Sequence, residues 1–203
     1  MSGNLIVFEG IDGSGKTTQI RRIADFLIKC GQQPLVTYEP TDNPIGSLAR
    51  WAVRGEVTLK EEAMALLFAA DRFQHVSDVI RPALESNKLV LCDRFVYSNM
   101  AYQSGNISMD VISEYNKDFF KLPSLTFFID TSPEECTRRI FSSRQHIEIY
   151  DGIENSKRIS GQYRAAFHAY KDQMPVNIID GNQPEDQVFE QIMQAMSSVC
   201  KLK

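Results

Sequence analysis

The chain has 203 residues, 43% of them hydrophobic and 24% charged, and a formal net charge of -4 at pH 7, which suits a globular protein with a single domain over residues 1–203. The acidic balance argues against a broad nucleic-acid surface, which normally needs an excess of basic side chains. The sequence has no apolar run approaching the roughly 20 residues that a helix needs to cross a bilayer, and its N-terminus shows no secretion signal. We therefore expect a cytoplasmic protein that has no membrane partner.

A glycine-rich motif follows an apolar run at residues 5–8 that predicts a buried strand. Residues 10–17 fit G-x-x-x-x-G-K-[ST] at every fixed position. Glycine permits positive φ and lets consecutive backbone N–H groups wrap a polyphosphate. We therefore expect a nucleotide-binding phosphate loop. Its residues are Gly10, Ile11, Asp12, Gly13, Ser14, Gly15, Lys16, Thr17 and Thr18.

Helical and strand patterns alternate after this loop. A helical pattern begins near Lys16, so the positive end of the helix dipole would point at the bound anion, and Gly31 stands where that helix would end. Residues 34–38 predict a second strand, which completes a strand, helix, strand unit. Turn-forming residues then predict a loop over 40–46, followed by a short helix over 48–53.

The middle of the chain is expected to be largely helical. Thr58 and Glu61 fit a capping box that opens a long helical region. Pro82 is expected to bend or interrupt its continuation, because proline lacks the backbone N–H of a helix interior. Residues 96–120 also predict helix, with a break at 104–106.

The second half of the chain continues the alternation. Two further strands are predicted over residues 125–129 and 176–179, each followed by a helical pattern. Between them, the segment over about 142–152 is polar and lacks apolar periodicity, so we expect a short mobile lid there. Five strands alternating with helices predict an α/β fold, with a five-stranded parallel β-sheet flanked by α-helices on both faces.

Asp93 and Arg94 come directly after a predicted strand over residues 89–92. Ligands of open α/β sheets collect at the carboxyl ends of the strands, so this pair can meet whatever lies on the phosphate loop. The phosphate loop alone also suits GTPases and motor ATPases. Grouped arginines favour a kinase that joins two phosphorylated molecules, because fixed cations must offset the repulsion between them.

Four blocks of sequence together resemble the thymidylate kinase family. They are residues 8–19, Glu39 with Pro40, residues 66–72 and residues 93–103, in the family's order and spacing. The last block, D-R-[FY]-x-x-S-x-x-A-Y-Q, is the most specific. The resemblance covers nearly the whole chain and implies a P-loop kinase fold, the substrates ATP and dTMP, the cofactor Mg²⁺, and a homodimer. The implied reaction gives dTDP and ADP in dTTP biosynthesis.

The resemblance also assigns roles to individual residues. Phe68 would stack on the thymine, Arg72 and Asn99 would contact the base, and Arg94 would clamp the monophosphate. An aromatic face with polar groups at one edge is a common way to hold a nucleobase. The implied acceptor-binding residues are Glu39, Phe68, Arg72, Arg94, Ser98, Asn99, Tyr102 and Gln103. The implied catalytic residues are Asp12, Lys16, Arg94 and Arg144, and the implied metal ligands are Thr17 and Asp93.

Two features depart from the family pattern. The family often has an arginine beside the Glu-Pro step, whereas the flanking residues here are Tyr38 and Thr41. One phosphate contact is therefore missing or supplied from elsewhere. Because the phosphate loop carries no arginine, the cation for the transferring phosphoryl group is expected from the lid. Arg144 is the best candidate, with Arg138 and Arg139 as alternatives.

Alternatives remain open on the sequence alone. Another nucleotide or nucleoside kinase of the same architecture is possible, and in a nucleoside kinase Glu39 could be the carboxylate base. A GTPase or other nucleotide-dependent switch is disfavoured, because the guanine-reading N-K-x-D pattern is absent. The histidines, His75, His146 and His168, occur singly, and we expect surface or internally satisfied histidines rather than a metal site or a catalytic base.

Overall fold

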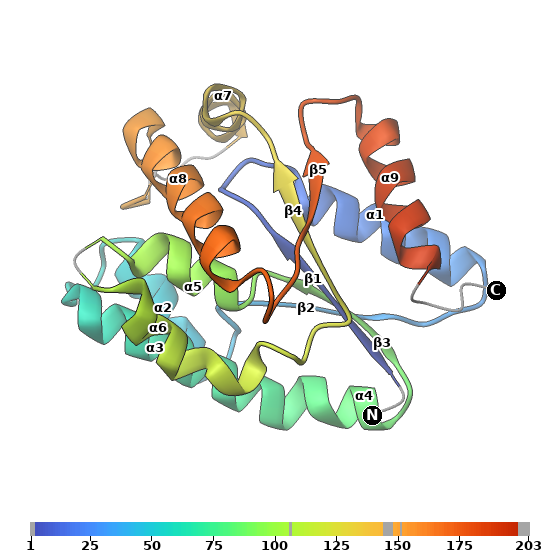
Figure 1. Ribbon diagram of the computed structural model, residues 1–203, viewed down its shortest axis with the longest axis horizontal. Coiled ribbons are helices and arrows are strands. Elements are labelled where there is room, and N and C mark those ends of the chain that lie inside the picture. Colours follow the sequence, from blue (N-terminus) through green and yellow to red (C-terminus); the bar gives the residue numbers. More distant parts are fainter. Residues whose placement is uncertain (1–2, 106, 144–147, 151, 199–203) are drawn as a thin grey trace.

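The sheet at the centre of the molecule has five parallel strands in the order β2-β3-β1-β4-β5 (Figure 1). This computed structural model describes residues 3–105, 107–143, 148–150 and 152–198. The strands are β1 (Asn4–Glu9), β2 (Leu35–Tyr38), β3 (Leu89–Asp93), β4 (Leu125–Asp130) and β5 (Asn177–Asp180). The predicted parallel sheet is therefore confirmed. Because β1 lies in the middle, between β3 and β4, the phosphate loop that follows it leaves the centre of the sheet edge.

Helices connect the strands and cover both faces of the sheet. The helices are α1 (Lys16–Lys29), α2 (Pro44–Val53), α3 (Glu61–His75), α4 (Arg81–Glu85), α5 (Val96–Gln103), α6 (Met109–Asn116), α7 (Pro133–Ser143), α8 (Ile153–Tyr170) and α9 (Glu185–Ser197). A π-helical turn, η1 (Val76–Ile80), joins α3 to α4, and a 3₁₀ turn, η2 (Lys117–Phe119), follows α6. Over the described part of the chain, every helix is too short or too polar to span a bilayer.

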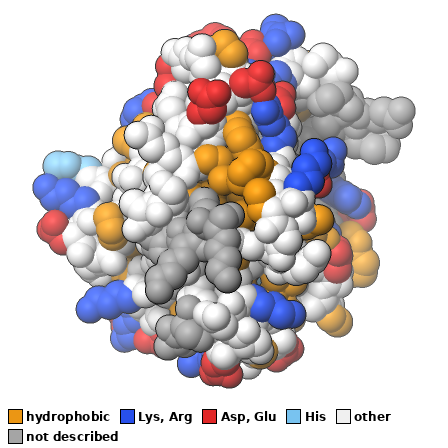
Figure 2. Space-filling view, turned by 90° about the vertical axis from the view of Figure 1, so that its right-hand side faces the viewer, with side chains coloured by type: hydrophobic (Ala, Val, Ile, Leu, Met, Phe, Trp, Pro, Cys, Tyr) orange, Lys and Arg blue, Asp and Glu red, His pale blue; other side chains and the backbone are white. Residues whose placement is uncertain are grey.

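Each face of the sheet has its own apolar core, because successive side chains of a strand point to opposite faces. From β1, Ile6 and Phe8 pack with α1 and α9, whereas Leu5 and Val7 pack with the layer formed by α3, α5, α6 and α8. Figure 2 looks onto the side that carries α1 and α9, where apolar side chains gather among charged ones. With both faces covered, the carboxyl ends of the strands form a rigid edge for a site.

Helix α2 begins earlier than the sequence predicts. The loop expected over residues 40–46 ends at Asn43, which is the N-cap of α2, and the side chain of Asn43 accepts a hydrogen bond of 2.8 Å from the N–H of Gly46. Pro44 occupies the first turn, where the missing N–H of proline costs nothing. The turn-forming residues therefore cap a helix, and the predicted helix start at residue 48 is wrong.

The long helical region after α2 also differs in detail. The capping box predicted at Thr58 is wrong, because α3 begins at Glu61 and Lys60 is its N-cap, without a side-chain cap. The predicted interruption near Pro82 is confirmed, and it takes the form of the π-helical turn before α4. Such a turn loosens the hydrogen-bond ladder where proline cannot donate to it.

The predicted lid is only partly covered by the structure. Helix α7 continues to Ser143, so the first residues of the segment over 142–152 are helical. Arg144 lies outside the described residues, as do residues 145–147 and 151. The mobility of the lid stays a prediction.

Candidate active site

The phosphate loop has the backbone geometry that its glycines predict. Gly10, Gly13 and Gly15 all have positive φ, of 151°, 78° and 101°. A Cβ at Gly13 would lie 2.5 Å from the carbonyl oxygen of Cys136, so a larger residue could not keep this path. The side chain of Lys16 folds back over the loop, and its Nζ donates to the carbonyl oxygens of Gly10 and Ile11, both at 2.9 Å.

The Lys16 ammonium is buried at the start of α1. Burial first, and then the positive charge of Arg94, lower the pKa of Lys16 to about 8. A buried ammonium at a helix N-terminus favours an anionic ligand, because both the ammonium and the helix end are positive. The loop is thus suited to a polyphosphate.

Thr17 and Asp93 meet beside the loop. The Thr17 hydroxyl donates a hydrogen bond of 2.6 Å to Oδ2 of Asp93. The other carboxylate oxygen, Oδ1 of Asp93, is buried and has no hydrogen-bond partner in the described ranges. A hydroxyl and an unsatisfied carboxylate oxygen are the ligand types that Mg²⁺ prefers. The two predicted metal ligands therefore fit this ion chemically.

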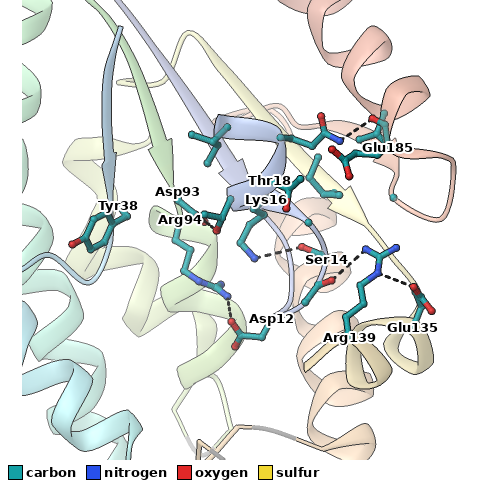
Figure 3. Close-up of a pocket in the computed structure, with 18 of the residues that line it drawn as sticks. Asp12, Ser14, Lys16, Thr18, Tyr38, Asp93, Arg94, Glu135, Arg139 and Glu185 are labelled. Atoms are coloured by element: carbon teal, nitrogen blue, oxygen red, sulfur yellow. Dashed lines mark hydrogen bonds and ion pairs between the residues drawn. The ribbon is translucent and has the colours of Figure 1, made fainter. Parts of the chain in front are cut away.

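A large cavity of about 800 Å³ lies over the phosphate loop and extends toward α7 and the loop after β5. Arg139 of α7 reaches the loop from this side, as Figure 3 shows, and its Nη1 donates to the carbonyl oxygen of Gly13 at 3.4 Å. Both Arg139 and its neighbour Arg138 pair with Glu135 at 2.7 Å, but the side chain of Arg138 is 69% exposed. Both arginines lower the pKa of Glu135, to about 2, Arg138 having the larger effect. Arg139 is the better placed of the two for a phosphate in this cavity, which we call the donor cavity.

A smaller cavity of about 180 Å³ lies on the other side of Arg94. Its walls come from α2, α3, α5 and the segment 148–150. Most of the predicted acceptor-binding residues line it, namely Glu39, Phe68, Arg72, Arg94, Ser98, Tyr102 and Gln103. We call it the acceptor cavity. Tyr150 closes one side of it, with its ring edge-on to Tyr102 and its hydroxyl accepting from Gln103.

Arg72 lies deep in the wall of the acceptor cavity, with 1% of its surface exposed. Its Nη2 forms an ion pair of 2.7 Å with Oε2 of Glu39 and donates to the carbonyl oxygen of Phe95 at 2.9 Å. The guanidinium carbon also lies 5.1 Å from the centre of the Phe95 ring. Its Nε is buried without a hydrogen-bond partner among the side chains and backbone described. A buried donor without a partner is costly unless a ligand satisfies it.

Asn99 lies behind Arg72 rather than in the lining of the acceptor cavity. Its Oδ1 accepts from Nδ2 of Asn116 at 3.0 Å, and its Nδ2 donates to Gln103 at 3.0 Å. Asn116 also accepts from Arg72. Asn99 therefore supports two residues of the cavity wall, and its predicted contact with a base stays a prediction.

The donor and acceptor cavities share Asp12, Glu39 and Arg94. Arg94 has a left-handed backbone, φ 71°, which is uncommon outside glycine. Its Nη2 donates to Oδ1 of Asp12 at 2.8 Å and to the Tyr102 hydroxyl at 3.0 Å (Figure 3 shows the Asp12 contact). A guanidinium fixed where two cavities meet can stabilise a phosphoryl group passing between them.

Glu9 is a buried residue that supports the wall of the acceptor cavity, and the sequence analysis gave it no role. It is buried on β1, and burial raises the pKa of its carboxyl group. Its carboxylate accepts from the N–H groups of Phe95 and Ser98 at 3.0 and 3.2 Å, and it also accepts from the hydroxyl of Tyr163. Because the N-cap of α5 makes no side-chain bond of its own, Glu9 caps this helix from the neighbouring strand. The signal available in the sequence was a glutamate at the end of an otherwise apolar run of strand residues.

Arg50 was also missed, and it bears on the arginine that is absent beside the Glu-Pro step. It comes from α2, lines the acceptor cavity, and donates to the carbonyl oxygen of Pro40 at 2.8 Å. Arg54 lines the same cavity. Helix α2 and its C-cap residue therefore bring positive charge to this cavity, although Arg50 also pairs with Asp42 at 2.7 Å. Nothing in the local sequence indicated this, because it depends on how α2 packs.

Glu39, His75 and Cys92 form a buried cluster, with one potential metal-ligating atom of each within 4.8 Å of the others. The cluster does not fit a metal ion. Arg72 already neutralises Glu39 at 2.7 Å, and burial holds the pKa of the Cys92 thiol well above its usual range, whereas a metal needs the thiolate.

Comparison with known proteins agrees with this geometry. A family model described as thymidylate kinase matches residues 8–192. The chain is 34% identical over 202 residues to the thymidylate kinase of Leptospira interrogans, which covers 98% of this chain and 96% of the other. It is 34% identical over 204 residues to the thymidylate kinase of Desulfotalea psychrophila, with 98% and 97% covered. A Pyrococcus abyssi protein named "Probable thymidylate kinase" is 38% identical over 188 residues, 87% of this chain and 89% of its own.

Proposed function

The chain belongs to the thymidylate kinase family, and we propose that it transfers the γ-phosphoryl group of ATP to dTMP, giving dTDP and ADP for dTTP biosynthesis. The observation that carries the proposal is the pair of cavities that share Asp12, Glu39 and Arg94. Phosphoryl transfer needs donor and acceptor to approach in line, and the protein contributes mainly position and charge.

ATP would occupy the donor cavity with its phosphates on the loop. The loop N–H groups and Lys16 would hold the β- and γ-phosphates. Thr17 and Asp93 would hold Mg²⁺, which when bound offsets the charge between these phosphates. In this role the Thr17 hydroxyl would stop donating to Asp93 and present its oxygen to the ion, and the unpaired Oδ1 of Asp93 supports that reading.

dTMP would occupy the acceptor cavity with its phosphate toward Arg94. The half-buried Phe68 offers a ring for the base. The unpaired Nε of Arg72 supports a hydrogen bond to a base carbonyl, because that donor is otherwise unsatisfied. Tyr102 would pack against the sugar, where its ring disfavours a 2′-hydroxyl.

Fixed cations would stabilise the charge that develops on the transferring group. Arg94 and Lys16 face the place where the cavities meet, and Asp12 orients Arg94 through the 2.8 Å contact. Arg139 is our candidate for a further cation, since it contacts the loop at Gly13. The role predicted for Arg144 falls outside the described residues and remains a prediction.

The predicted homodimer and cytoplasmic location are also part of this proposal. Along α3 and η1, Leu66, Phe73 and Val79 are apolar and 49%, 49% and 37% exposed. Leu66 and Phe73 are seven residues apart and therefore share one helix face. An exposed apolar stripe of this kind supports an interface with a second copy. Sedimentation equilibrium should give twice the chain mass for the native protein and a lower mass for a Phe73→Lys variant.

A coupled assay of ADP release with ATP and Mg²⁺ tests the reaction itself. The acceptors to compare are dTMP, dUMP, dCMP, dGMP, AMP and thymidine. We expect dTMP to be turned over well above the others. A preference for thymidine would indicate a nucleoside kinase that uses Glu39 as its base. Equal rates of ADP release with all acceptors would contradict the proposed function.

A further inference from the structure

His75 is a buried histidine, 2% exposed, at the C-terminal end of α3. Both of its ring nitrogens have partners. Nδ1 lies 3.0 Å from Oε1 of Glu39, and Nε2 lies 2.7 Å from Oγ1 of Thr37 on β2. The ring is therefore held between the edge strand of the sheet and the residue that follows it.

The chemistry of these partners fixes the direction of each hydrogen bond. A carboxylate can only accept, so Nδ1 must carry the hydrogen that points at Glu39. In the neutral ring, Nε2 is then the acceptor for the Thr37 hydroxyl. Glu39 thus selects the tautomer of the neutral ring, and the Thr37 hydroxyl adapts to it by donating to Nε2.

Glu39 links His75 to the wall of the acceptor cavity. Its Oε1 accepts from His75, while its Oε2 pairs with Nη2 of Arg72 at 2.7 Å. Thr37, His75, Glu39 and Arg72 form a chain of contacts no longer than 3.0 Å that runs from the sheet to the cavity wall. Without His75, one oxygen of a buried carboxylate would lose its donor and the carboxylate would be free to turn.

We propose that His75 is a positioning residue for the acceptor: it orients Glu39, which in turn holds Arg72 at the acceptor cavity. The proposal rests on the proposed function, since it takes this cavity to bind the nucleoside monophosphate. His75 does not itself line either the donor or the acceptor cavity, so it acts through Glu39. The role is specific to one nitrogen of the ring.

Two amide variants separate that role from simple filling of space. In His75→Asn, the side-chain amide occupies the region of Nδ1 and can still donate to Glu39. In His75→Gln, the amide extends toward the region of Nε2 and Thr37. We expect His75→Ala to raise the KM for dTMP about tenfold, as the loss of a hydrogen bond to a charged group does. The KM for ATP should stay within about twofold in every variant, and His75→Asn should recover to within about threefold of the wild-type KM for dTMP.

His75→Gln should resemble His75→Ala in the KM for dTMP. His168→Ala, at an exposed position on α8, is the matched control and should change neither constant. Equal KM values for dTMP in the Asn and Gln variants would overturn the proposal, as would a parallel rise in both KM values. If His75→Ala does not fold, the KM values for dTMP of the Asn and Gln variants still test the positioning role.

A second readout is independent of activity. With three histidines in the chain, ¹⁵N labelling of the imidazole rings resolves the tautomer of His75 by NMR, with His75→Asn identifying its signals. We expect the hydrogen on Nδ1, and a shifted Nε2 resonance in Thr37→Val. A hydrogen on Nε2 alone would refute the positioning role. A wild-type protein that shows the expected tautomer but does not phosphorylate dTMP would refute the proposed function instead.

Discussion

The donor and acceptor cavities are built in different ways. The floor of the donor cavity is one continuous stretch, residues 12–20, whose path depends on the positive φ angles of Gly13 and Gly15. The acceptor cavity is made of side chains from α2, α3, α5 and the segment 148–150. A backbone cradle can recognise any polyphosphate, whereas a particular acceptor requires side chains held in place by packing. Variants that affect one cavity and spare the other test this contrast.

The largest effect is expected from Lys16→Ala in the donor cavity. Lys16 is the buried cation over the loop, and its loss removes charge stabilisation of the transferring group. The value of kcat should fall about a thousandfold, the scale found when a preorganised charge-stabilising group is deleted. Initial rates at saturating dTMP measure it, with circular dichroism as the check on folding. A loss smaller than about tenfold would contradict the role.

Arg94→Ala tests the place where the cavities meet. Arg94 is fixed by Asp12 and Tyr102, and a clamp on the acceptor phosphate predicts a loss of about a hundredfold in kcat/KM for dTMP. The affinity for ATP should change by no more than about twofold, as measured by equilibrium binding without dTMP. Equal losses for both nucleotides would mean that Arg94 serves the donor and would remove the distinction between the cavities.

Two neighbouring arginines of α7 provide an internal control on the donor side. Both arginines pair with Glu135, but Arg139 also contacts the loop at Gly13, whereas Arg138 is 69% exposed. Arg139→Ala should lower kcat about twentyfold. Arg138→Ala should stay within about twofold, because exposed ion pairs contribute little. Steady-state rates of the two variants decide the assignment, and the reverse order would shift the role to Arg138.

The smallest expected effect is a pH dependence of kcat/KM for ATP that kcat/KM for dTMP does not share. Burial lowers the pKa of Lys16 to about 8, so the free protein loses this positive charge as the pH rises through that value. The kcat/KM for ATP should be level below the pKa and fall by about tenfold between roughly pH 7 and 9, since this constant reports ionisations of the free protein. The kcat/KM for dTMP at saturating ATP should not share that fall. In Lys16→Arg the guanidinium stays charged, so the fall in kcat/KM for ATP should disappear. If this variant keeps the pH profile of the native protein, the titrating group is not Lys16.

Arg50 and His75 mark the limit of what could be predicted from the sequence. Phe68, Arg72 and Tyr102 could be predicted to share a cavity, because the blocks that carry them are specific. Arg50 lies three residues before the end of a helix whose start was itself mispredicted. Its place in the acceptor cavity depends on how α2 packs against α3. His75, which looked like an isolated histidine, turned out to contact Glu39, 36 residues away.

By itself, the sequence determined the phosphate loop, the five parallel strands and the two-sided helical cover, because each follows from local residue types and from the periodicity of apolar side chains. Tertiary structure alone decided those contacts above the sheet that no sequence motif carries. It capped α5 with Glu9, brought Arg50 to the Glu-Pro step, and joined Thr37 through His75 to Glu39. The physical reason is that a loop or a strand is specified by neighbours along the chain, whereas these contacts depend on the packing of elements far apart in it.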